Sequence, residues 1–297
     1  MYKEFAIIAP TASGKTALSI RLAHKLDAVI LSLDSLAVYK KIDIASAKPT
    51  IQERDGIIHF GIDCVFPNEV FDVIEFYAEY KKAKLYAQQQ NKNLIIVGGT
   101  GFYLKALVDG LSKTPFISEA TKNEVDKKVQ NLESLYTYLY TVDEKYMKNI
   151  KSTDKYRIEK AAEIYFETAI IPSAYFEKNR PQPLIDSLNI FEIQTDPEVL
   201  RKRIQKRTKI MIQEGIIDEV ISLEKEYTRL PNCMKSIGIK ETLDYLDNKI
   251  SKNELELLIS THTAQLAKRQ RTFNKSQFTN IKKETLDNIE NLIVSYY

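Results

Sequence analysis

Residues 9–16 are of types that suit the binding of phosphate groups. In order they are Ala9, Pro10, Thr11, Ala12, Ser13, Gly14, Lys15 and Thr16, and they follow the pattern G-x-x-x-x-G-K-T except that alanine replaces the first glycine. In such a loop the backbone N–H groups surround phosphate oxygens, the lysine neutralises charge and the threonine hydroxyl can bind Mg²⁺. Because this stretch lies between an apolar run and a helical pattern, it predicts a phosphate-binding loop and not a chance turn.

Asp34 follows a second apolar run and precedes Ser35. Its carboxylate has two possible functions: it could hold Mg²⁺ through water, or it could act as a general base toward an acceptor nucleophile. A third interpretation is structural, with Asp34 and Ser35 capping the next turn. These residues alone leave the three interpretations open.

The sequence Gly98-Gly99-Thr100-Gly101 follows a third apolar run. Glycines at the end of a strand can form a tight turn, or they can let a ligand approach the backbone closely. The pair of glycines by itself does not distinguish these two interpretations.

Arg203 and Arg207 are four residues apart and would share one face of a helix, where both could reach a diphosphate or an RNA backbone. Six of the nine residues from Arg201 to Lys209 are basic, and residues 268–271 contain three more. The formal net charge of +3 is too small to require a nucleic-acid partner. For each basic group on its own, a solvated helix face is the simpler interpretation.

These residues must be positioned by strands and helices that alternate along the chain. Four short runs are predicted strands: Phe5–Ala9, Val29–Leu33, Leu94–Val97 and Asn189–Ile193. Helical patterns separate them, so the chain is expected to form an α/β fold, a P-loop core with a mainly parallel sheet. Ligands of such sheets bind beyond the carboxyl ends of the strands, which is where the phosphate loop, Asp34 and Thr100 fall.

The pattern changes between residues 113 and 183, where charged, tyrosine-rich helical segments occur without a clear buried strand. We expect an inserted helical domain there, and a core formed by residues 1–112 and 184–297. Beyond the insertion, Asp196 and Pro197 open a long predicted helix whose apolar stripe runs from Leu200 to Val220. From Lys235 on, the chain is expected to be mostly helical.

The composition excludes several classes of protein. With 297 residues, of which 44% are hydrophobic and 28% charged, the chain can bury a sizeable core. Two cysteines do not predict a disulfide framework, and no cysteine–histidine cluster has the spacing of a zinc site. No signal peptide is evident, and no apolar run approaches the roughly 20 residues that span a bilayer. We therefore expect a cytoplasmic protein without membrane association.

Six segments, taken in order, resemble the tRNA dimethylallyltransferase family, whose members are also called tRNA isopentenyltransferases. They are APTASGKT (9–16), LDSLAVYKKIDIASAKPT (33–50), GGTGFYLKAL (98–107), RIEKAAEIY (157–165), SIGIKE (236–241) and QLAKRQRTF (265–273). The resemblance covers nearly the whole chain, and its most specific part is the phosphate loop followed by Asp34-Ser35, Ala47-Lys48-Pro49 and Gly98-Gly99-Thr100. It implies a P-loop prenyltransferase core with an inserted tRNA-binding domain.

For this family, the resemblance implies transfer of a dimethylallyl group from its diphosphate to N6 of adenosine 37 of tRNA, next to the anticodon. The phosphate loop, which is also the usual ATP-binding motif, would then hold a leaving group and would not hydrolyse a nucleotide. Asp34 would be the general base that takes the proton from the adenine amine. Lys15, Thr16, Mg²⁺ and Arg207 would stabilise the departing diphosphate, and Thr100 would form a hydrogen bond near the reacting centre.

The resemblance also implies tRNA contacts, made after the acceptor base leaves the anticodon-loop stack. Ser35, Leu36 and Ala37 would line the adenosine pocket together with Asp34 and Thr100. Further contacts would come from Tyr156, Arg157, Ile158, Glu159 and Lys160 of the inserted domain, and from Lys235, Ser236, Ile237, Gly238, Ile239 and Lys240 of the core. The helix from Gln265 to Phe273 would add basic contacts, and the family implies a monomer.

Several residues depart from the usual pattern of the family, although none of them removes a reacting group. Ala9 replaces a glycine, Ala37 a glutamine, Lys160 an arginine and Phe273 a tryptophan, while Arg271 stands where an apolar residue or threonine is usual. The Cβ of Ala9 predicts a negative φ at that position. Phe273 lacks the N–H that an indole would donate.

Two other functions are compatible with the phosphate loop. A small-molecule or nucleotide kinase would share the loop, Asp34 and Mg²⁺ and would have to bind ATP, but the sequence lacks a convincing arginine-rich lid. A noncatalytic RNA-binding protein could use a nucleotide as a switch, although the presence of Lys15, Thr16 and Asp34 argues against it.

Overall fold

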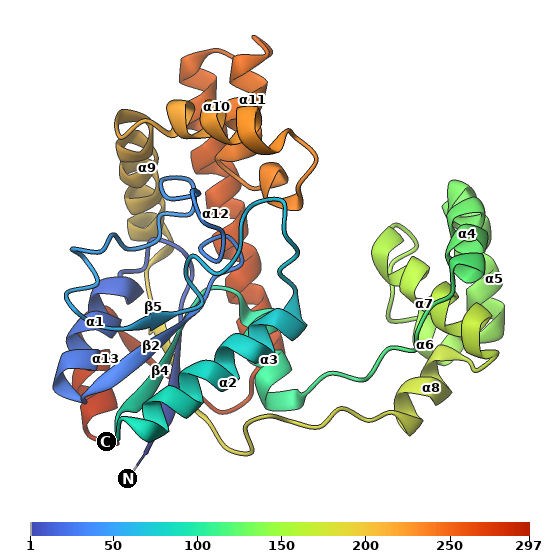
Figure 1. Ribbon diagram of the computed structural model, residues 1–297, viewed down its shortest axis with the longest axis horizontal. Helices are drawn as coiled ribbons and strands as arrows, with labels where there is room; N and C mark the ends of the chain where they lie inside the picture. Colours follow the sequence, from blue (N-terminus) through green and yellow to red (C-terminus); the bar gives the residue numbers. More distant parts are fainter. Residues whose placement is uncertain (1) are drawn as a thin grey trace. The chain divides into compact units, whose positions relative to one another are not determined.

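The computed structural model describes residues 2–297, which form two compact units. The core unit comprises residues up to Val108 together with Ile185–Tyr297, and the inserted unit comprises Asp109–Leu184. The chain can be followed by its colours in Figure 1. By this division the insertion extends a few residues beyond the range 113–183 expected from the sequence.

The core unit contains one six-stranded sheet in which every neighbouring pair of strands is parallel. The strand order is β3-β2-β4-β1-β5-β6. The strands are β1 (Glu4–Ile8), β2 (Ala28–Leu33), β3 (His59–Phe60), β4 (Asn93–Gly98), β5 (Asn189–Gln194) and β6 (Ile281–Thr285). The predicted α/β class and parallel sheet are confirmed.

Two strands at the edges of the sheet were not predicted from the sequence. β3 has only two residues, which is too short for a periodic pattern, and β6 has the polar sequence IKKET. β6 is half-exposed along its length, so it lacks the apolar run by which the central strands were found. Edge strands of this kind are defined by their pairing partners, here β2 and β5.

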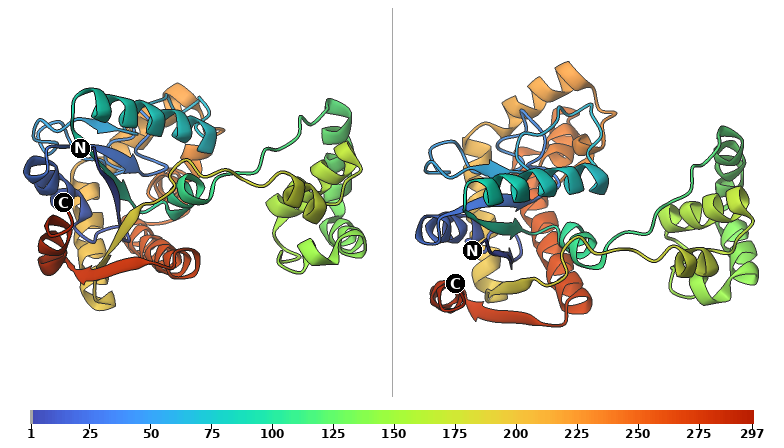
Figure 2. Two further views of the ribbon diagram at one scale, coloured as in Figure 1. Left: turned by 90° about the horizontal axis from the view of Figure 1, so that it is seen from below. Right: turned by 60° about the horizontal axis from the view of Figure 1, so that its bottom comes forward.

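Helices pack on both faces of the sheet. The core-unit helices are α1 (Lys15–Lys25), α2 (Val73–Gln89), α3 (Gly101–Asp109), α9 (Pro197–Gln213), α10 (Ile216–Tyr227), α11 (Ile239–Leu246), α12 (Lys252–Gln277) and α13 (Leu286–Val294), with a short 3₁₀ helix, η2 (Asn232–Lys235). Phe5 and Ile7 of β1 are buried in one cluster with Leu18 of α1 and Ile289 of α13. Figure 2 shows the α1–α13 pair and α2 on opposite sides of the sheet, as the two-residue period of a strand requires.

Helices α9 to α12 form a second apolar cluster with the segment that follows β2. Val38 and Ile42 of that segment are fully buried, as are Ile216 of α10 and Ile239 of α11. The expected long helix that reached Val220 is wrong, because α9 ends at Gln213 and α10 begins at Ile216. Gly215 between them has a φ of 98°, a left-handed conformation that glycine adopts readily and that ends a helix.

The inserted unit consists of helices around a core of its own. They are α4 (Glu119–Lys128), the 3₁₀ helix η1 (Val129–Asn131), α5 (Leu132–Val142), α6 (Glu144–Met147), α7 (Lys155–Thr168) and α8 (Pro172–Lys178). Side-chain oxygens of Ser118, Asn131, Asp143 and Asp154 cap the first turns of four of these helices. Apolar residues of α4, α5 and α7 pack together inside the unit. Among residues 2–297, no helix is long and apolar enough to cross a membrane.

Candidate active site

The phosphate loop joins the end of β1 to the start of α1. Gly14 has a φ of 89° and precedes the first helical residue. This left-handed conformation favours glycine, and a Cβ atom on Gly14 would also lie 2.8 Å from a methyl carbon of Leu286, whose flexible side chain would have to shift. Ala9 is not among the residues with positive φ, as predicted, and its N–H donates to the carbonyl oxygen of Gly98 at 3.3 Å. The alanine of the loop that has a positive φ is Ala12, at 62°.

Three side chains from the second half of the chain hold this loop in place. Nη1 of Arg207 donates to Oγ1 of Thr11 at 3.0 Å, and Nη1 of Arg203 donates to the carbonyl oxygen of Ser13 at 3.3 Å. From α12, Oε1 of Gln270 accepts the backbone N–H of Thr11 at 3.1 Å. The two arginines of α9 therefore contact the loop itself, and their helix face is not simply solvated.

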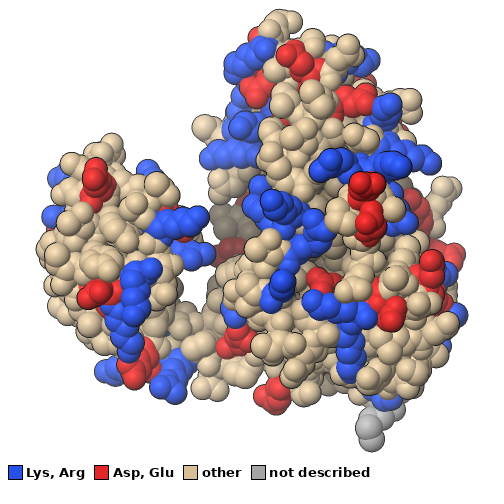
Figure 3. Space-filling model, turned by 180° about the vertical axis from the view of Figure 1, so that it is seen from behind, with Lys and Arg blue, Asp and Glu red and all other residues tan. Residues whose placement is uncertain are grey.

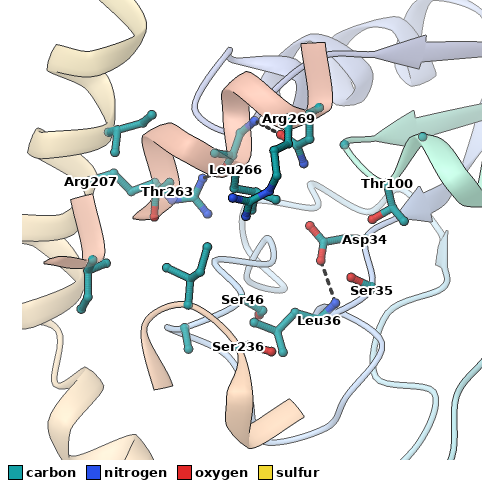
Figure 4. Close-up of a pocket in the computed structure, with 18 of the residues that line it drawn as sticks. Asp34, Ser35, Leu36, Ser46, Thr100, Arg207, Ser236, Thr263, Leu266 and Arg269 are labelled. Atoms are coloured by element: carbon teal, nitrogen blue, oxygen red, sulfur yellow. Dashed lines mark hydrogen bonds between the residues drawn. The ribbon is translucent and has the colours of Figure 1, made fainter. Parts of the chain in front are cut away.

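Asp34 lies directly beyond the carboxyl end of β2. Its Oδ1 atom accepts hydrogen bonds from the N–H groups of Leu36 and Ala37, at 2.9 and 3.2 Å, which is the turn-capping geometry expected for an aspartate. Within residues 2–297, Oδ2 forms no such bond. Figure 4 shows the carboxylate in the cavity, with the side chain of Thr100 beside it. One oxygen thus orients the side chain, and the other is available for chemistry.

The Gly98–Gly101 turn packs tightly against its neighbours. A Cβ atom on Gly98 would lie 2.3 Å from the carbonyl oxygen of Leu33, and one on Gly99 would lie 2.4 Å from Nε2 of Gln270. The N–H groups of Gly99 and Thr100 both donate to that same carbonyl oxygen, at 3.2 and 3.0 Å. The glycines are explained by this close packing, which fixes Thr100 next to the end of β2.

A cavity of about 520 Å³ brings most of these residues together. Its walls come from the phosphate loop, the segments after β2 and β4, residues 235–237 before α11, and helices α9 and α12. The residues that line it include Thr11, Lys15, Asp34, Ser35, Leu36, Ser46, Thr100, Phe102, Ile204, Arg207, Met211, Lys235, Ser236, Ile237, Ile259, Leu266, Arg269, Gln270 and Phe273. The expected location of ligands beyond the strand ends therefore coincides with a cavity.

A smaller space of about 70 Å³ shares Lys15, Asp34 and Arg207 with the large cavity. Thr16 and Ala37 line this smaller space. Within residues 2–297, no group of three or more histidine, cysteine, aspartate or glutamate side chains could hold a metal ion. The two side chains expected to bind a metal through oxygen, Thr16 and Asp34, both line this smaller space.

The charges in the large cavity are mostly positive. Lys15, Arg207, Lys235 and Arg269 line it, and Asp34 is the only acidic residue among the described residues that do so. Burial lowers the pKa of Lys15 to about 8; Asp34 acts to raise it and Arg207 to lower it further. Burial also lowers the pKa of Arg207, against the effect of Asp34. Cations held in such surroundings favour a negatively charged ligand.

The structure separates the predicted tRNA-contacting residues of the core into two groups. Lys235, Ser236 and Ile237 line the large cavity, and so do Ser35 and Leu36. In contrast, Gly238 and Ile239 are buried, with Ile239 completely inaccessible in the apolar cluster of α9–α12, and Ala37 is 3% exposed. Lys240 is exposed on α11.

In the inserted unit, the predicted residues lie in the first turn and a half of α7. Tyr156 is 69% exposed, and Arg157 and Lys160 are also exposed. Ile158 is fully buried and Glu159 is partly buried. Lys160 Nζ lies 2.6 Å from Oε2 of Glu163. An exposed aromatic ring flanked by cations is a surface that RNA can use.

Several residues of the site were not identified from the sequence. Ser46 and Phe102 line the large cavity, and so do Ile204 and Met211 of α9 and Ile259 and Leu266 of α12, which form its apolar wall. Gln270 was noted only as part of a basic segment. Its contact joins residues 259 positions apart, so no local spacing could have revealed it.

Comparisons with known proteins agree on one family. A family model described as IPP transferase matches residues 37–277. The tRNA dimethylallyltransferase of Aliarcobacter butzleri is 57% identical over 295 residues, covering 99% of each chain, and that of a Sulfurovum species is 53% identical, covering 98% of this chain and 97% of its own.

Solved structures give the same result. A tRNA isopentenylpyrophosphate transferase from Bacillus halodurans is 28% identical, with a TM-score of 0.71 and coverage of 99% of this chain and 96% of its own. A eukaryotic dimethylallyltransferase, studied as it acts on tRNA, is 25% identical, with a TM-score of 0.83 and coverage of 99% and 77%. The P-loop core is therefore shared with enzymes of solved structure.

Proposed function

The chain belongs to the IPP transferase family of tRNA dimethylallyltransferases, and from this membership we propose the reaction that its cavity carries out. The chain is an enzyme that transfers a dimethylallyl group to tRNA. The donor is dimethylallyl diphosphate, and the acceptor atom is N6 of adenosine at position 37, adjacent to the anticodon. The products are N6-dimethylallyladenosine in tRNA and free diphosphate.

One arrangement supports this reaction above all others: a single carboxylate shares a cavity with the cations of a phosphate loop. Asp34 lines the same space as Lys15 and Arg207. A prenyl donor needs cations for its diphosphate, and the acceptor amine needs a base for the proton it loses when its nitrogen bonds to the allylic carbon. The cavity offers both, and Figure 4 shows Asp34 and Arg207 among the side chains that line it.

Asp34 is the general base in this proposal. Because Oδ1 is held by two backbone N–H groups, the side chain has a fixed direction, and Oδ2 can accept the proton from N6. Thr100 lies beside it on the turn after β4 and can hydrogen-bond near the reacting centre. Ser35 and Leu36 line the part of the cavity next to Asp34, where the adenine would be bound.

The phosphate loop binds the diphosphate that leaves. Lys15 and Arg207 stabilise the negative charge that grows on it as the bond between the allylic carbon and oxygen breaks. A bound diphosphate would raise the pKa of Lys15, which burial lowers to about 8, and would therefore favour its charged form further. Residues 12–16, at the end of the loop and the start of α1, supply the backbone N–H groups that would face the diphosphate.

Magnesium is the metal we propose for this site. Mg²⁺ is usually bound by one or two protein oxygens together with substrate phosphates, and Thr16 and Asp34 line one small space beside Lys15. This donor set fits Mg²⁺ bound mainly through the diphosphate, and it does not fit a metal held by protein alone. When bound, the ion would help to neutralise the leaving diphosphate.

The proposed tRNA contacts lie on two surfaces, one in the core unit and one in the inserted unit. In the core, Lys235 to Ile237 line the cavity and Lys240 is exposed beyond it. In the inserted unit, Tyr156, Arg157 and Lys160 are exposed on α7, and we propose that they contact the anticodon arm. Ile158 and Ile239 can contribute only through their backbone, because both side chains are buried. We further propose a monomeric enzyme, as the family resemblance implies, and a cytoplasmic one, because its proposed substrate is tRNA.

The reaction can be tested with purified protein, Mg²⁺, dimethylallyl diphosphate and unmodified tRNA that carries adenosine at position 37. Nucleoside mass spectrometry should detect N6-dimethylallyladenosine without added ATP. The same tRNA with guanosine at position 37 should yield no modified nucleoside. Modification of the guanosine-37 tRNA, or a requirement for ATP, would contradict the proposed acceptor or the proposed role of the loop.

A further inference from the structure

Arg269 is a cation in the wall of the large cavity with no partner of its own. The other three cations there each donate a hydrogen bond: Lys15 to the carbonyl oxygen of Pro10, Arg207 to Thr11, and Lys235 to Asn232. Within residues 2–297, no hydrogen bond or ion pair of the Arg269 side chain is found. Figure 4 shows this side chain extending from α12 into the space that Asp34 faces.

The orientation of α12 relative to the phosphate loop is fixed by a contact of the residue after Arg269. The following residue, Gln270, accepts the N–H of Thr11 at 3.1 Å. Leu266, Arg269, Gln270 and Phe273 all line the large cavity, which is the i, i+3, i+4, i+7 spacing of one helix face. Lys268 and Arg271 line a separate groove between α9 and α12, so the basic residues of this segment face two different directions. Of the three basic residues, Arg269 is the one that lines the large cavity, which the phosphate loop also lines.

The charge balance leaves a role for this arginine. A diphosphate carries several negative charges, and Asp34 adds another to the same cavity. Lys15 and Arg207 already use part of their hydrogen-bonding capacity on the loop. An arginine whose planar fork of N–H groups is unoccupied suits a phosphate group that needs two parallel hydrogen bonds.

We propose that Arg269 binds the diphosphate of the prenyl donor and, together with Arg207, stabilises it as the leaving group. This inference rests on the proposed function and extends it by a second guanidinium. Arg269 contacts substrate in this account, whereas Gln270 acts through Thr11 and is a positioning residue.

The test uses the whole protein and three variants. Arg269→Gln removes the charge, Arg269→Lys keeps the charge without the fork, and Lys275→Gln is the matched control, since it removes an exposed cation of α12 that lines neither the large cavity nor the α9–α12 groove. Calorimetric titration with inorganic pyrophosphate and Mg²⁺ should show about tenfold weaker binding for Arg269→Gln. Arg269→Lys should lose less, and Lys275→Gln should stay within about twofold of the native protein, because the Lys275 side chain is exposed and lines neither space.

Steady-state kinetics complete the test. The KM for dimethylallyl diphosphate should rise with Arg269→Gln by a similar factor, while thermal unfolding shows that the variant is folded. Pyrophosphate affinity and donor KM equal to those of Lys275→Gln would overturn the inference, and a rise in the KM for tRNA alone would assign Arg269 to the RNA. Pyrophosphate binding needs no transfer, so loss of it in Arg269→Gln together with an inactive native protein would refute the proposed reaction and leave this inference standing.

Discussion

Nη1 of Arg207 lies 3.0 Å from Oγ1 of Thr11 and donates a hydrogen bond to it. A helix far along the chain therefore holds the phosphate loop directly, and it places a guanidinium beside Lys15. The loop and α9 line one cavity, although residues 109–184 separate them in sequence as a unit of their own.

Replacing Arg207 should weaken donor binding. We expect Arg207→Ala to raise the KM for dimethylallyl diphosphate about tenfold to a hundredfold, since a charge-assisted hydrogen bond and the support of Thr11 are both lost. Arg207→Lys should raise it less, because the charge remains and only the fork is removed. An unchanged donor KM with weaker tRNA binding would place this arginine on the RNA instead.

Replacing Asp34 should separate catalysis from binding. Asp34→Asn retains an oxygen that can accept the N–H groups of Leu36 and Ala37, but an amide cannot take up the proton. We expect kcat to fall about 10²- to 10⁴-fold, while calorimetry shows pyrophosphate affinity within about threefold of that of the native protein. Near-normal turnover would require another base. Loss of pyrophosphate affinity would favour the role of Asp34 in holding the metal.

Glu219 of α10 should stabilise the loop that carries Ser46 into the cavity. Its carboxylate accepts three consecutive backbone N–H groups, those of Asp43, Ile44 and Ala45, at 2.8, 2.7 and 2.9 Å. We expect Glu219→Ala to lower the free energy of unfolding by about 1–3 kcal/mol, measured with urea. The KM for tRNA should also rise, because Ser35, Leu36 and Ser46 line one wall of the cavity.

Glu214→Ala is the control for this variant. Glu214 is exposed at the end of α9, and its side chain has no hydrogen bond or ion pair within residues 2–297. Its replacement should change the free energy of unfolding by less than about 0.5 kcal/mol. Equal stability of the two variants would show that the three N–H groups find other acceptors.

Gly98 should tolerate no side chain. Because a Cβ there would lie 2.3 Å from the carbonyl oxygen of Leu33, which is backbone, Gly98→Ala should lower the free energy of unfolding by about 3 kcal/mol. Gly56 has open space around its Cβ position but a φ of 73°, so Gly56→Ala should cost only about 1 kcal/mol of conformational strain. Denaturant unfolding of both variants measures the difference, and equal losses would contradict the packing role of Gly98.

The sequence predicted the features of the site that depend on local patterns. The phosphate loop, the central strands and the inserted helical segment follow from residue types and their spacing, and Asp34 and Thr100 follow from their positions at strand ends. The same local patterns gave a wrong prediction of one long helix across α9 and α10. The apolar stripe continues across Gly215, although the helix does not.

The rest of the site depends on contacts between distant segments. Gln270 with Thr11, Leu286 with Gly14, and Glu219 with residues 43–45 are each set by the packing of the whole core unit. The polar strand β6 is likewise defined by pairing with β5 and not by its own sequence. Nor does residue type show whether an isoleucine such as Ile239 faces the cavity or the core.

The most direct test of the account compares two products in one reaction, the diphosphate released and the N6-dimethylallyladenosine formed in tRNA, with no nucleotide added. We predict equal amounts of the two at every time point, because the phosphate loop holds the leaving group of the transfer itself. Diphosphate released without an equal amount of the modified nucleoside, or transfer that proceeds only with ATP, would contradict the central claim.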